Sequence, residues 1–148
     1  IVGTGSEEIY LKQLISDNKF NENFIFKNRI PHDEIYNYHK ISNLYVSLNK
    51  YGNLSNANLE AINFCNCIIM LNPDNETHTD IFTKKLLCDS VIYIDRVNII
   101  DSLVEVIKNL YMNQSLISEY KTKISKKKSL FCSWKERIDK EIQIIKNL

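Results

Sequence analysis

The chain carries one carboxylate in a setting that could bind a ligand, Glu60, which follows a polar loop rich in glycine and asparagine. An apolar, β-favouring run at residues 44–48 enters this loop. A short helix-like segment holds Glu60, and a second apolar run at residues 67–71 follows. In a parallel sheet, this order places the loop at the carboxyl ends of the strands, where such sheets bind ligands. Backbone N–H groups at the helix start would favour an anion such as phosphate.

The four cysteines give a weaker signal. Cys65 and Cys67 form a C-x-C pair, but no second pair or histidine follows at zinc-finger spacing. A disulfide between residues two apart in a strand would be strained. We therefore expect reduced, buried cysteines in a cytosolic protein, with Cys88 and Cys132 included.

The histidines do not predict a metal or cofactor site. His32 and His39 fall in an expected helix, and we expect them to be exposed or half-buried without a ligand. His78 and Asp80 lie two positions apart, but two ligands without a third do not make a metal site. We expect neither a metal nor a cofactor.

Bulk composition restricts the class of protein. The chain has 148 residues, which suggests one domain, and 44% of them are hydrophobic, enough for an ordinary core. A net charge of +1 argues against a nucleic-acid-binding protein. No apolar run approaches the roughly 20 residues that span a bilayer, and no signal peptide is visible. Because the chain starts at Ile1 inside an expected strand, we expect it to be an N-terminally truncated piece of a longer protein.

The alternation of apolar runs and helical periodicity predicts an α/β fold. We expect a Rossmann-like parallel sheet of about five strands with helices on both faces, and C-terminal helices packed alongside, in one domain over residues 1–148. The strands are continuous apolar runs, as expected when both faces of a sheet are covered. The expected strands are residues 1–3, 23–27, 44–48, 67–71 and 91–94.

Local signals predict the helix boundaries. Ser6 is the expected N-cap of a first helix, in which Glu7 and Glu8 would suit the dipole. Near the C-terminus, Ser133 and Glu136 form a capping box. The apolar stripe of that last helix consists of Trp134, Ile138, Ile142 and Ile145. Gly3 and Gly5 are only a fragment of a dinucleotide fingerprint, because its third glycine is missing.

Four stretches, in order, resemble one known family. They are IVGTGSEEIYLKQL, NFIFKNRIPHDEIYNYHKISNLYVSLN, NLSNANLEAINFCNCIIM and a C-terminal helix that begins Ser-Trp. Together they resemble the C-terminal domain of GT-B glycosyltransferases, most closely the large retaining family 4, the glycosyl transferases group 1. The resemblance covers nearly the whole chain and depends on the order and spacing of these stretches.

The resemblance implies a donor-binding site. Glu60, in Leu59-Glu60-Ala61, matches the second of two family glutamates, which binds the ribose of a nucleotide-activated sugar. An ionised carboxylate can accept two hydrogen bonds from a vicinal diol. The loop before Glu60, the first turn of the chain and a loop beside the base complete the implied donor site: Gly52, Asn53, Ser55, Asn56, Ala57, Asn58, Leu59, Gly3, Gly5, Asn28, Arg29 and Ile30. N–H groups at the helix start would stabilise the diphosphate leaving group.

The chain departs from the family pattern at several positions. Gly52 stands eight positions before Glu60, where the first glutamate of the pair is usual. Asn53 or Asn56 is a candidate for contacting sugar hydroxyls in its place. Cys65 stands where glycine is usual. The basic pair that clamps the diphosphate lies before Ile1 in the family, so we expect this chain alone not to catalyse transfer, and no catalytic residue is assigned.

The resemblance implies a hexosyltransferase that acts on a nucleotide-diphosphate sugar and a glycan or lipid-linked acceptor, together with an N-terminal acceptor domain. It implies a bacterial polysaccharide pathway and a cytoplasmic location, with peripheral association at the inner face of the membrane as an option. Two alternatives stay open. Gly52 and Cys65 motivate a degenerate, non-catalytic binding or scaffold domain, and a sugar-nucleotide epimerase would share the architecture.

Overall fold

The computed structural model describes residues 1–50, 53–73, 80–131 and 134–147. The chain divides into two compact units, Ile1–Tyr38 and His39–Leu148.

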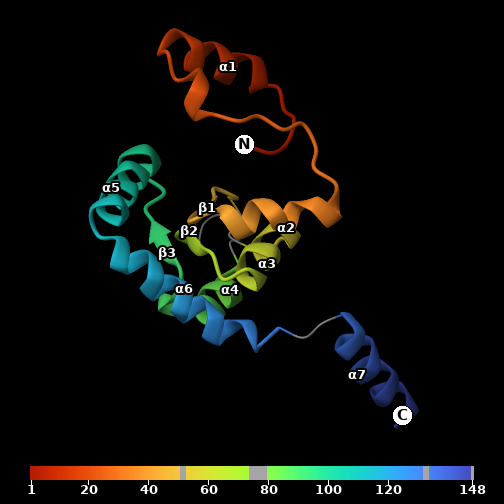
Figure 1. Ribbon diagram of the computed structural model, residues 1–148. Coiled ribbons are helices and arrows are strands. Elements are labelled where there is room, and N and C mark those ends of the chain that lie inside the picture. Colours follow the sequence, from red (N-terminus) through yellow and green to blue (C-terminus); the bar gives the residue numbers. More distant parts are fainter. Residues whose placement is uncertain (51–52, 74–79, 132–133, 148) are drawn as a thin grey trace. The chain divides into compact units, whose positions relative to one another are not determined.

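The second unit is built on a parallel three-stranded sheet (Figure 1). The strands β1 (Leu44–Ser47), β2 (Cys67–Leu71) and β3 (Ile92–Ile94) lie in the order β1-β2-β3. All five residues of β2 are buried, because this strand has a neighbour on each side and covered faces. Its continuous apolar sequence is what a parallel strand of this kind requires.

Helices cover both faces of this sheet, as the sequence predicts. On one face Ile68 and Met70 of β2 pack with residues of α3 (Asn56–Asn63), α4 (Ile81–Leu87) and α6 (Gln114–Lys128). On the other face Ile69 and Leu71 pack with residues of α5 (Ile99–Met112) and the first half of α6. Alternate β2 side chains thus enter opposite cores, the period expected of a strand.

The helix α6 links the two cores. Ile117 belongs to the core that contains α5, and Ile124, two turns later, belongs to the core that contains α3. The last helix, α7 (Trp134–Lys146), differs from the expected C-terminal packing. Its stripe residues Ile138, Ile142 and Ile145 are exposed, and the predicted cap Ser133 lies outside the described residues.

The first unit corrects the prediction of five strands. It holds α1 (Glu8–Asp17), a short 3₁₀ helix (Asn21–Asn23) and most of α2 (His32–Ile41). The expected strands at residues 1–3 and 23–27 form one isolated parallel bridge, between Val2 and Lys27, and not two strands of a sheet. The Ile1 amino group also donates to the Ile25 carbonyl at 2.7 Å. The 3₁₀ helix occupies the start of the second run, and no residue of 1–38 is buried, so the bridge lacks the covered faces of a parallel sheet.

The start of α1 also differs from the prediction. Glu7, not Ser6, occupies the N-cap, and it makes no side-chain capping bond. The Ser6 hydroxyl donates instead to the Glu7 carboxylate at 3.2 Å. In the described part of the chain, the helices are all too short or too polar to cross a bilayer.

Candidate functional site

Glu60 lies in the second turn of α3, not at the helix start. The helix begins at Asn56, and Ser55 caps it by accepting a bond from the Asn58 N–H at 3.3 Å. The helix dipole acts mainly on charges in the first turn, so it gives little reason for a carboxylate at position 60. Asn56 precedes Glu60 by four residues, which places both side chains on the same face of α3.

Side-chain amides hold the loop before α3 in place. The Asn58 Nδ2 donates to the Asn53 carbonyl at 2.6 Å, and the Asn49 Nδ2 donates to Asn53 Oδ1 at 2.7 Å. Asn58 is 1% exposed and its Oδ1 has no bonded partner within the described residues. Ser55 and Asn58 therefore shape the loop from inside, whereas Asn53, Asn56 and Ala57 are exposed. Leu59 is half-buried, and Gly52 lies outside the described residues.

A buried histidine stands beside Glu60. His39 Nε2 lies 3.8 Å from Glu60 Oε2, and the His39 side chain is 8% exposed against 22% for Glu60. Tyr45 on β1 is close as well: burial raises the pKa of its hydroxyl, and the Glu60 charge raises it further. Glu60 thus keeps partial access to solvent while its carboxylate faces a ring that the core fixes.

The burial of His39 corrects the expectation of an exposed or half-buried side chain. The residue is 7% exposed because Asn66, Tyr45 and Phe64 surround it. Asn66 is 27 residues away and comes from the turn between α3 and β2. Helical periodicity gives the direction in which His39 points, but the sequence has no local signal for a partner so far along the chain.

The turn after α3 explains Cys65. Its φ is +54°, a left-handed conformation in which glycine carries no steric cost. The Cys65 N–H bonds to the Ile62 carbonyl and the Asn66 N–H to the Ala61 carbonyl, which together form a Schellman motif. Cys65 therefore adopts the backbone conformation that a helix-ending glycine would adopt, and the fold is kept.

Arg96, which is not among the residues predicted from the sequence, connects the carboxyl ends of the strands. Arg96, which follows β3, donates from Nε to the Asn72 carbonyl after β2 and from Nη2 to the Lys50 carbonyl after β1. Lys84 of α4 also reaches this edge and donates to Asn72 Oδ1 at 2.7 Å. The loop that leads toward α3 is thus anchored by a side chain 46 residues away.

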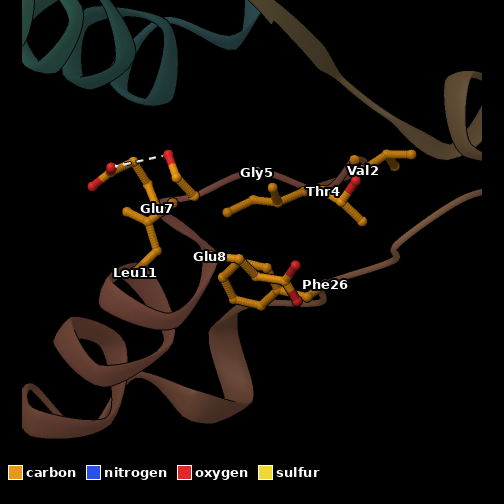
Figure 2. A pocket seen from close by; sticks show the side chains of 10 residues that line it. Val2, Thr4, Gly5, Glu7, Glu8, Leu11 and Phe26 are labelled. Carbon is orange, nitrogen blue, oxygen red and sulfur yellow. Dashed lines mark hydrogen bonds between the residues drawn. The ribbon is translucent and has the colours of Figure 1, made fainter.

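The first unit holds the other predicted donor residues. A pocket of about 300 Å³ is lined by the turn at residues 1–8 together with Leu11 and Phe26 (Figure 2). Gly3 has φ +130°, which only glycine adopts readily. A Cβ added at Gly3 or at Gly5 would meet no atom within 4 Å, so steric space alone does not require glycine at either position. Asn28 and Arg29 are exposed and Ile30 is half-buried. Gly3, Gly5 and residues 28–30 thus belong to one unit, and Asn53 through Glu60 to the other.

The described cysteines are free thiols of differing exposure. Cys67 is fully buried, and that burial raises the pKa of its thiol to about 11, against a lowering by Lys121. Cys65 is half-buried and Cys88 is exposed, so the expectation that these cysteines are buried is wrong for Cys88. Cys88 lies at the end of α4, where the chain turns with a positive φ before β3. Cys132 lies outside the described residues.

No metal centre is formed by the residues that the structure describes. Among them no group of three or more His, Cys, Asp or Glu side chains lies together. Asp80 instead caps α4: its carboxylate accepts from the Thr83 hydroxyl at 2.6 Å and from the Thr83 N–H at 3.1 Å. These bonds lower the pKa of Asp80, with the hydroxyl bond as the largest cause. His78 lies outside the described residues.

Comparison with known proteins gives one match. A family model described as "Glycosyl transferases group 1" matches residues 1–129, well over half of the 148 residues. No curated protein and no solved structure matches the chain. The matched region includes the whole first unit and the second unit as far as the residue after α6. It therefore includes Glu60 and the loop before it. The chain therefore belongs to the glycosyl transferases group 1 family.

Proposed function

We propose that this chain is the nucleotide-sugar-binding half of a retaining glycosyltransferase, with Glu60 as the ligand of the nucleotide ribose. The family assignment supports glycosyl transfer in general. The observation that carries the finer proposal is the position of Glu60. It is a partly exposed carboxylate in the second turn of a helix that follows the loop at the carboxyl end of β1. Ligands of parallel sheets bind at that edge.

The remaining parts of the proposal follow from the chemistry of a nucleotide-diphosphate sugar. The exposed Asn53 and Asn56 are candidates for the sugar hydroxyls, the N–H groups at the start of α3 for the diphosphate, and residues 28–30 for the base, with Gly3 and Gly5 as further cleft residues. The acceptor would be a glycan or a lipid-linked glycan, bound by an additional domain, and basic side chains outside this sequence would bind the diphosphate. The sugar would be attacked on the face from which the nucleotide leaves, and no protein nucleophile is assigned.

The experiment is a calorimetric titration of the intact protein with UDP, GDP and ADP. Glu60→Gln should weaken the tightest of these about 10- to 100-fold, because hydrogen bonds to a charged group contribute about 1.5–3 kcal/mol. Glu105→Gln, which changes an exposed carboxylate on α5, is the matched control and should leave affinity unchanged. Wild-type affinity in Glu60→Gln would contradict the role of Glu60.

A non-catalytic binding domain is the second candidate, and one observation bears on it. Cys65 adopts the left-handed conformation that a glycine would adopt, so this departure from the family does not break the fold. Gly52, which stands where the family has a glutamate, remains the reason to consider a loss of activity. Release of free nucleotide from UDP-, GDP- or ADP-sugars by the intact protein would decide between the two, since a binding domain releases none. The family match does not favour an epimerase.

A further inference from the structure

The proposed donor site does not itself use His39, although this buried titratable group lies 3.8 Å from Glu60. His39 occupies the last turn of α2 and is 7% exposed. Titratable side chains are seldom buried without a specific partner. Its partners come from three further places in the chain: β1, α3 and the turn before β2.

Asn66 fixes the orientation of the imidazole. The Asn66 Nδ2 donates to the carbonyls of His39 at 2.9 Å and Ser42 at 3.2 Å, so its amide nitrogen faces two acceptors. The Asn66 Oδ1 is therefore the atom that faces His39 Nδ1, at 2.8 Å. An amide oxygen only accepts, so Nδ1 must carry a proton. This hydrogen-bond network leaves Nε2 to face Glu60.

Ring contacts fix the plane of the imidazole. Phe64, the C-cap residue of α3, stacks on the His39 ring with centroids 5.7 Å apart and planes 6° apart. Tyr45 of β1 lies 5.5 Å from the ring on a tilted plane. The ionisable groups that face His39 are thus Glu60 from α3 and Tyr45 from β1. Held by Asn66 and these two rings, Nε2 has one direction in which to point.

We propose that His39 is a positioning residue that holds the Glu60 carboxylate in the orientation used for the nucleotide ribose. The 3.8 Å separation is too long for a hydrogen bond, so the effect on Glu60 is mainly steric. The imidazole ring, held by Asn66 and its two aromatic neighbours, fills the space behind the carboxylate. Glu60 is thereby limited to fewer side-chain orientations before the ligand arrives. The inference rests on the proposed role of Glu60.

Two variants of His39 test the Nδ1 side and the Nε2 side of the imidazole separately. His39→Asn places an amide nitrogen near the position of Nδ1, so it keeps a donor for Asn66 and loses the group that faces Glu60. His39→Gln places its amide near the position of Nε2, so it keeps a group of similar reach facing Glu60 and loses the donor for Asn66. Each is titrated with the tightest of UDP, GDP and ADP and with the 2′,3′-dideoxy form of the same nucleotide, which lacks the ribose diol.

For the ribonucleotide, His39→Asn should weaken binding about fivefold, the size expected for loss of one side-chain contact with a partly exposed group. Binding of the dideoxy nucleotide should not change. His39→Gln should recover most of the ribonucleotide affinity even where thermal unfolding shows that it is the less stable variant. Equal losses for both nucleotides, or wild-type affinity in His39→Asn, would overturn the proposal.

A measurement on folded His39 covers the case in which neither variant folds. The ¹⁵N resonance of His39 Nε2 should shift in Glu60→Gln and on addition of the ribonucleotide to the wild-type protein. No shift in either experiment would refute the proposal. Failure of the two inferences is distinguishable: if Glu60→Gln itself binds normally, the proposed function fails, and if only the His39 tests fail, Glu60 keeps its role without His39.

Discussion

Cys65 shows how one backbone angle can account for a departure from a family pattern. A left-handed conformation at the end of a helix costs a non-glycine residue roughly 1–2 kcal/mol. Cys65 adopts φ +54° and its side chain packs against the core that contains Ile62 and Ile124. The contact with the core offsets part of the backbone cost, so the residue is tolerated where glycine is usual.

We predict that Cys65→Gly stabilises the protein. Removing the strain should outweigh the loss of a half-buried thiol, for a net gain of about 0.5–1 kcal/mol in the free energy of unfolding. Urea unfolding followed by circular dichroism measures it. Asn63→Gly, two residues earlier and inside α3, is the matched control and should lower stability. A destabilised Cys65→Gly would mean that packing of the thiol dominates.

Arg96 sets the arrangement of several elements at once. Its guanidinium bonds to carbonyls that follow two different strands, while the residue itself follows the third. A planar guanidinium joins these two acceptors from donors on separate atoms in fixed directions, whereas the donors of an ammonium group all lie on one freely rotating nitrogen. The connection between β1 and α3, which carries the proposed sugar-binding asparagines, is therefore attached to the rest of the sheet edge.

We predict that Arg96→Ala lowers the free energy of unfolding by about 1–2 kcal/mol, because two hydrogen bonds from a charged donor are lost and water replaces only part of them. Arg96→Lys should not rescue the loss. Nucleotide affinity should fall in both variants. Arg137→Ala, which breaks an exposed pair with Glu141 on α7, should change neither quantity by more than about 0.5 kcal/mol. Full rescue by lysine would contradict the two-carbonyl role.

At the scale of the whole molecule, buried side chains are concentrated in the second unit. Both cores lie on the two faces of its sheet, whereas residues 1–38 contain no buried side chain. Local opening costs least where few apolar contacts are lost. The two units should therefore differ in stability even though the family match covers both.

Hydrogen exchange followed by NMR measures that difference. Amides of β2, between two strands and two cores, should exchange at the rate set by global unfolding. Amides of α1, which buries no residue, should exchange at least about 100-fold faster, as expected for a local opening that costs some 3 kcal/mol less. Equal protection in α1 and β2 would show that the first unit shares a buried core.

The sequence alone predicted what depends on neighbouring residues. Apolar runs and helical spacing predicted the strands β1 to β3 and the helices α1 to α3 and α7, because hydrophobic period is a local property. It also predicted the family, which the matched region confirms. The single domain over residues 1–148 and the donor role of the predicted residues stay predictions. The two N-terminal strands were wrong, since a run of apolar residues becomes a strand only when a partner extends the ladder.

Only the tertiary structure decided what surrounds Glu60. The sequence identified the carboxylate and the loop before it, but not the His39 ring behind it or the Arg96 bridge beside it. Both depend on contacts between residues 21 to 46 positions apart, and no local pattern encodes such contacts. Chain connectivity fixes which side chains an element carries, whereas packing of the sheet and its helices fixes which of them meet.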